Sequence, residues 1–130
     1  MSAVVEVRTH EVEIESLRAP ASCRAGEPVE VVVDVSSSRY DEFVELRLFV
    51  RVPGCKVLVE QDDRTAFAVR AGGARSATRA VLQATVPAAA YAAGSVTIEA
   101  VVVILGGLDA TGCERSRTIS IPVESALVDR

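Results

Sequence analysis

Apolar residues alternate with polar or charged residues along much of this 130-residue chain. The clearest run, at residues 29–35, reads VEVVVDV, and similar alternation recurs at 43–52, 76–86 and 96–105. Successive side chains of a β-strand point to opposite faces, so a period of two builds a sheet with one buried face. Several such runs, separated by turn residues, predict an all-β fold in which two antiparallel sheets pack together.

We expect seven to eight strands in a single domain spanning residues 1–130. A chain of this length buries about two-thirds of its unfolded surface, which gives one core without covalent staples. The expected strands are residues 4–17, 29–36, 43–52, 56–60, 65–70, 76–86, 96–105 and 113–124.

Two segments are expected to change direction or sheet. In the first strand the apolar frame of Val5 and Val7 switches to that of Val12 and Ile14, which requires a bulge or break near residues 9–11. The alanine-rich segment between Pro87 and Ser95 is too short for a stable helix alone. We interpret it as the corner that joins the two sheets.

Several motifs resemble those of bacterial immunoglobulin-like sandwiches. Residues 26–33 read GEPVEVVV, which fits the G-x-P-V-x-V-x-V second strand of adhesion-type modules, and Pro20 precedes them. A Pro-x-x-x-Tyr corner formed by residues 87–91 then precedes the strand at 96–105. The resemblance covers about residues 12–124 and implies an immunoglobulin-like fold. It lacks the strand-three Trp and the inter-sheet Cys pair of antibody domains.

The net charge and the first residues limit which partners and which cellular compartment are expected. The formal net charge is −4 and Lys56 is the only lysine, which argues against a nucleic-acid partner, because phosphate neutralisation needs clustered basic residues. Residues 1–6 lack the basic and apolar regions of a signal peptide, and no apolar stretch reaches roughly 18 residues. We expect a cytoplasmic or virion protein that does not insert into a membrane.

The three cysteines leave two alternatives open. An odd number without a signal peptide favours free thiols in a reducing compartment. In an immunoglobulin-like topology, however, the turns that hold Cys23 and Cys55 lie at the same end, so these two residues could form a disulfide. Cys113 begins the last strand at the opposite end. A zinc site built from the cysteines and His10 is not expected, since no Cys-x-x-Cys pair exists.

The sequence contains no recognisable catalytic constellation. His10 is the only histidine, and no serine lies in a Gly-x-Ser-x-Gly setting, so a Ser-His-Asp triad is not expected. The carboxylate pairs Asp41-Glu42 and Asp62-Asp63 are sequence neighbours in expected turns, whereas glycosidase chemistry needs carboxylates that face each other. Neither turn has the alternating carboxylate spacing of a calcium loop. We predict no enzyme activity, cofactor or metal.

One face of the strand at 96–105 is expected to carry surplus apolar surface. With alternate residues directed into the core, Val101, Val103 and Leu105 point outward, and Leu108 follows in the next loop. The neighbouring strand presents Phe49 on the same face. Contiguous exposed apolar surface marks protein interfaces, so these five residues are the predicted interface. The alternative is that the chain itself covers them.

The edges of an open sandwich offer a second way to bind a partner. Edge strands present unpaired backbone groups, to which another chain can add a strand. The long first strand and the tail at 125–130 are the candidates for such exchange.

These features predict a non-enzymatic structural or protein-interaction module, whose partners are copies of itself or other subunits. A subunit or accessory role in a larger assembly fits, for example capsid decoration in a phage particle. A carbohydrate- or calcium-binding module that uses its loops is the alternative. The scarcity of aromatic side chains argues against a sugar ligand, since the chain has two tyrosines and no tryptophan.

Overall fold

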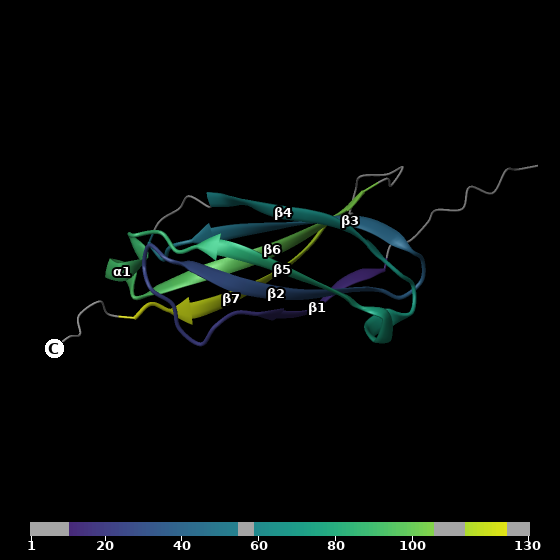
Figure 1. The fold of residues 1–130 in the computed structure, drawn as a ribbon, viewed down its shortest axis with the longest axis horizontal. Coiled ribbons are helices and arrows are strands. Elements are labelled where there is room, and N and C mark those ends of the chain that lie inside the picture. Colours follow the sequence, from purple (N-terminus) through teal and green to yellow (C-terminus); the bar gives the residue numbers. More distant parts are fainter. Residues whose placement is uncertain (1–10, 55–58, 106–113, 125–130) are drawn as a thin grey trace, which may run out of the picture.

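Seven strands form two antiparallel sheets in the computed structural model, which describes residues 11–54, 59–105 and 114–124 (Figure 1). One sheet has the strand order β1-β2-β5 and the other has the order β4-β3-β6-β7. The strands are β1 (Val12–Arg18), β2 (Pro28–Ser37), β3 (Glu42–Arg51), β4 (Val59–Val69), β5 (Thr78–Thr85), β6 (Ser95–Leu105) and β7 (Glu114–Pro122). The predicted two-sheet antiparallel immunoglobulin-like sandwich is confirmed.

The alternation read from the sequence produces the core between the sheets. β2 contributes Val31, Val33 and Val35, all fully buried, and their intervening residues face outward. β3 supplies Leu46 and Leu48 from the opposite sheet. Burial of each such side chain contributes about 1.5–3 kcal/mol, so many small aliphatic residues replace the few large aromatic ones of other cores.

The fourth strand differs from the prediction. Two short strands separated by a turn at 61–64 were expected, but residues 59–69 form the single strand β4. Arg64 pairs with Arg47 and Glu60 pairs with Phe49, so three residues of β4 oppose one residue of β3. The prediction was wrong because polar side chains of this segment accept hydrogen bonds from the other sheet, so the chain continues as a strand and does not form a turn. In a constant-type immunoglobulin domain the fourth strand belongs to the first sheet, whereas here it pairs with β3.

The described part of the first strand contains a bulge. Ile14 pairs with Val35 and Ser16 pairs with Asp34, which leaves Glu15 without a partner in the ladder. The extra residue shifts the alternation of side chains between the two faces by one position. Val12 and Leu17 are therefore both buried, although five residues separate them and a regular strand would place them on opposite faces. The predicted break near residues 9–11 lies almost entirely outside the described residues.

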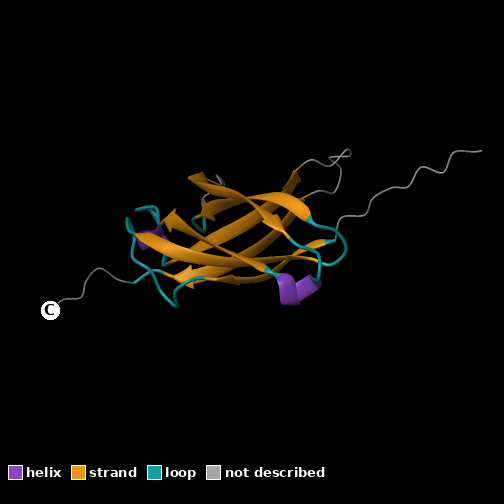
Figure 2. Cartoon of the chain, turned by 45° about the vertical axis from the view of Figure 1, so that its right-hand side comes forward, coloured by secondary structure: helices purple, strands orange, loops and turns teal. Residues whose placement is uncertain are grey.

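The predicted corner between the sheets is confirmed. It contains a single helical turn, α1 (Ala90–Ala93), which ends at Gly94 with a left-handed φ of 78°. A 3₁₀ turn at Gly73–Ser76 precedes β5 at the opposite end of the sandwich (Figure 2). Among the described residues, no helix is long and apolar enough to cross a membrane.

Replacing a central core residue should destabilise the fold far more than replacing an exposed one. Leu46→Ala should lower the free energy of unfolding by about 2–5 kcal/mol, because it leaves a cavity between the sheets. Val81→Ala is the matched control, since Val81 is 54% exposed on the outside of β5, and it should change that free energy by less than about 0.5 kcal/mol. Urea unfolding measures both values, and equal losses would contradict this core.

Candidate functional site

The predicted interface residues lie on the outer face of the four-stranded sheet. β3 and β6 are antiparallel neighbours, as expected, and Val101 lies in register with Arg47. Phe49, Val103 and Leu105 are half-buried, whereas Val101 is only 8% exposed. The expectation that Val101 is exposed is therefore wrong, because it occupies the middle of the sheet between β3 and β7. Leu108 lies outside the described residues, and a role of these residues in an interface stays a prediction.

Ion pairs cover the middle of this face. The Arg47 Nε atom donates a 2.6 Å hydrogen bond to Glu45 Oε1 and lies 3.9 Å from Glu60 Oε1. Arg64 Nη1 lies 3.8 Å from the same Glu60 oxygen. The hydrogen bond from Arg47 to Glu45 raises the pKa of the Arg47 guanidinium. These charges separate the apolar residues near the two ends of the sheet.

An exposed apolar row crosses one end of the same face. Phe43 is 51% exposed, and it lies in register with Leu105 on one side and with Ala68 on the other. The row therefore crosses β4, β3 and β6, and half-buried Val103 adjoins it on β6. The predicted interface did not include Phe43. Phe43 and Phe49 are an even number of residues apart in one strand and so point to the same face, and this spacing could have identified Phe43 from the sequence. We call Phe43, Leu105 and Ala68 the apolar row.

The outer face of the three-stranded sheet is organised around one carboxylate. Asp34 Oδ1 accepts a 2.9 Å hydrogen bond from Arg79 Nε, and Asp34 Oδ2 accepts one of 2.7 Å from Ser16 Oγ. Arg18 Nη2 lies 3.3 Å from the same Oδ2 atom. The hydrogen bond from Arg79 is the largest effect on Asp34 and holds the pKa of its carboxyl below its usual value. Periodicity places Asp34 on the outer face, but it cannot identify partners on β1 and β5.

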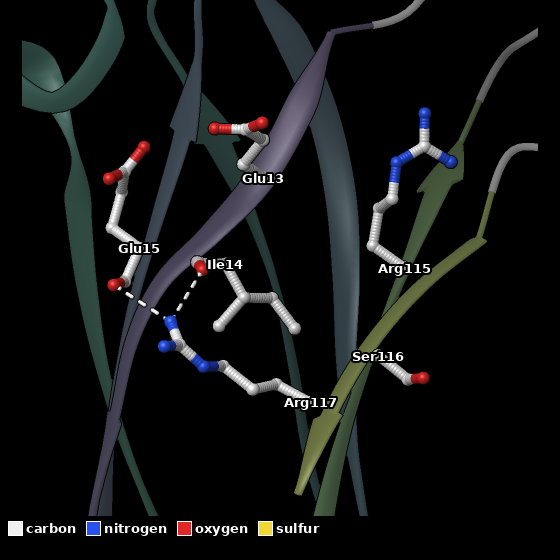
Figure 3. Close-up of a pocket in the computed structure, with 6 residues that line it drawn as sticks. All are labelled: Glu13, Ile14, Glu15, Arg115, Ser116 and Arg117. Carbon is white, nitrogen blue, oxygen red and sulfur yellow. Dashed lines mark hydrogen bonds between the residues drawn. The ribbon is translucent and has the colours of Figure 1, made fainter.

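A groove separates the edge strands β1 and β7, which belong to different sheets (Figure 3). Its volume is about 390 Å³. Arg117 crosses the groove, and its Nη1 atom donates to the carbonyl oxygens of Ile14 at 3.0 Å and of Glu15 at 2.9 Å (Figure 3). The groove is lined by Glu13, Ile14, Glu15, Arg115, Ser116 and Arg117. Backbone acceptors between charged side chains suit a polypeptide main chain better than an apolar small molecule.

Polar side chains also close the opposite edge of the sandwich. On β4, Asp63 Oδ2 accepts a 2.6 Å hydrogen bond from the backbone amide of Gln83, and Gln61 Oε1 accepts one of 2.9 Å from the backbone amide of Thr85. Both amides belong to β5, the edge strand of the other sheet. Gln61 and Asp63 thus satisfy backbone donors that a sheet edge otherwise leaves open.

Of the two carboxylate pairs, the structure describes the side chains of Asp41, Glu42 and Asp63. Asp63 binds the β5 edge, and Asp41 Oδ1 accepts a 2.7 Å hydrogen bond from the Ala71 amide. Glu42 is buried, at 7% exposure. Among the side chains that the structure describes, no group of three from His, Cys, Asp or Glu could hold a metal ion.

The Cys23 thiol is buried, and its Sγ atom lies 3.6 Å from the carbonyl oxygen of Pro122. Burial raises the pKa of this thiol, which makes it a poor nucleophile. Cys55, Cys113 and His10 lie outside the described residues, so the Cys23–Cys55 disulfide stays a prediction.

Solved structures share this fold at low sequence identity. The CARDB domain of the PF1109 protein from Pyrococcus furiosus, solved in complex with di-metal ions, matches with a TM-score of 0.58 and 12% identity over 94% of this chain and 95% of that one. The sporulation control protein Spo0M from Bacillus subtilis matches with a TM-score of 0.52 and 16% identity over 92% of this chain. A β-glucosidase from Listeria innocua matches with a TM-score of 0.52 and 14% identity, also over 92% of this chain.

These likenesses establish the fold alone. The matched region is 51% of Spo0M and 16% of the β-glucosidase, so this chain corresponds to only part of either protein. No family model matches the chain. A search of curated proteins by sequence likewise finds no match. The expected resemblance to immunoglobulin-like sandwiches is confirmed as a β-sandwich, and the narrower adhesion type stays a prediction.

Asp34→Asn should make the free energy of unfolding depend less steeply on pH at acidic pH. Because the pKa of Asp34 is lowered in the folded chain, its ionised form stabilises the fold above the unfolded pKa of about 3.9. That contribution is lost as the pH falls through the lower, folded pKa. Urea unfolding at several pH values from about 6 down to 3 should show a steeper loss in the native chain than in Asp34→Asn. Equal slopes would contradict this role of Asp34.

Proposed function

We propose that this chain is a non-enzymatic protein-interaction module, a subunit or accessory protein of a larger assembly. The observation that carries the proposal is the apolar row, with Phe43 exposed at its centre. Aromatic side chains dominate interface energetics, because each buries a large area with little loss of conformational freedom. A half-exposed Phe on a regular sheet is therefore well suited to a partner's pocket.

The surroundings of the row match the arrangement of an interface. Effective contact surfaces combine an apolar centre with a polar rim that excludes water. Here the Glu45–Arg47 ion pair lies directly beside the row on β3, and Val103 adds half-buried apolar area on β6. The row is built on three hydrogen-bonded strands, so binding need not order a loop.

The described residues favour this role over a loop-based carbohydrate or calcium module. Asp41 and Asp63 are engaged by backbone amides, and the part of the chain that the structure describes holds no metal-binding group of three side chains. Capsid decoration in a phage particle, a cytoplasmic or virion location and the absence of a nucleic-acid partner stay predictions.

Phe43→Lys should abolish binding to the partner, because it places a charge at the centre of the apolar row. Val81→Lys is the matched control, since Val81 is similarly exposed but lies on the outer face of the other sheet. Each tagged chain is purified from its native source, and the co-purifying proteins are identified. We expect the native chain and Val81→Lys to retain a common partner that Phe43→Lys loses.

The same partners at equal yield with all three chains would overturn the apolar row as the contact surface. Circular dichroism and thermal unfolding of each variant establish that the sandwich is intact, so that a lost partner reports on the surface and not on folding.

A further inference from the structure

The exposed edge of β1 offers backbone acceptors that are bound by a side chain and not by a strand. The carbonyl oxygens of Ile14 and Glu15 both accept from Arg117 Nη1. β1 pairs with β2 and β7 pairs with β6, and no ladder joins the described parts of β1 and β7. The groove between them has the volume of a ligand site, about 390 Å³. Added strands bind such edges through main-chain hydrogen bonds.

The chain that precedes β1 has the composition of a strand. Residues 4–8 read VVEVR, in which three of five residues are β-branched valines. The Ser38 amide donates to the Glu11 carbonyl oxygen at 3.1 Å, so the extended pairing of β1 with β2 continues up to Glu11. Residues 8–11 read RTHE and contain no Gly, Pro, Asn or Asp, the residues that a tight reversal favours. The sequence therefore disfavours a hairpin back into the chain's own groove.

We propose that residues 4–8 of a second copy of this chain add to the free edge of β1, and that the exchange is reciprocal. With a two-fold axis near His10, residues 4–8 of one copy lie antiparallel to residues 12–16 of the other. The same contacts then form twice, as a closed two-fold dimer requires.

Charge complementarity supports this occupant. In the antiparallel register Glu6 lies across from Ile14, whose carbonyl oxygen Arg117 now binds. The Glu6 amide of the added strand takes over the Ile14 carbonyl oxygen, because facing residues of a hydrogen-bonded antiparallel pair exchange their backbone hydrogen bonds, and Arg117 is displaced. Glu6 is the one carboxylate in residues 4–8, and it arrives beside the displaced guanidinium. Arg117 is therefore an internal competitor that holds the edge closed until a second copy binds.

Sedimentation equilibrium of the full chain, under reducing conditions and over a wide concentration range, tests the exchange. We expect a monomer–dimer equilibrium that Glu6→Pro abolishes, because proline has no amide to donate to the Ile14 carbonyl oxygen. The matched control Glu6→Gln keeps the amide and the length of the side chain, and it should retain the dimer with a weaker affinity, because the carboxylate beside Arg117 is lost. Arg117→Ala should lower the dimer dissociation constant by about tenfold, because it removes the competitor.

Adding Glu6→Pro to Arg117→Ala should restore the monomer, which separates strand exchange from nonspecific association. The comparison is repeated with Phe43→Lys in every chain, so that association through the apolar row does not contribute. A monomer at every concentration in both the native chain and Arg117→Ala would overturn the proposal. So would a dimer that survives Glu6→Pro. If Arg117→Ala fails to fold, the native chain, Glu6→Pro and Glu6→Gln still decide the question.

Discussion

The structure depends on how an open sandwich satisfies the backbone groups at its sheet edges. Two sheets of three and four strands have four edge strands, β1 and β5 in one sheet and β4 and β7 in the other. The described chain closes each side of the sandwich with side chains that cross to backbone groups of the opposite sheet. Asp63 and Gln61 reach β5 on one side, and Arg117 reaches β1 on the other. These contacts let the aliphatic core be enclosed without a barrel.

The two sides of the sandwich are closed by different chemistry, and this difference separates stability from binding. On the β4–β5 side, acceptor side chains hold individual amides at 2.6 and 2.9 Å. On the β1–β7 side, one arginine spans a groove and satisfies two carbonyl oxygens. A single long side chain loses substantial conformational freedom in such a bridge, so it yields to a competing strand more readily. The apolar row lies away from both closed sides, on the outer face of the four-stranded sheet.

Sequence periodicity predicted the architecture because burial on one face leaves a period of two, as at Val31, Val33 and Val35. It failed where a residue's role depends on another part of the chain. Gln61 and Asp63 read as a turn because they are polar, yet their partners lie 24 and 20 residues away on β5. The alternation along β6 directs Val101 to the outer face, but it lies between β3 and β7 in the middle of the sheet and is buried there. Phe43 could have been found from parity, whereas Arg117 and its two acceptors could not, because the bulge at Glu15 shows no clear signature.

Amide hydrogen exchange of the native chain, resolved by residue with NMR, tests the closed edges most directly. If side chains seal the β4–β5 side, the Gln83 and Thr85 amides exchange slowly, at rates close to those of amides inside the ladders, although both lie on an edge strand. Exchange of these two amides at the rate of unstructured peptide would contradict the account.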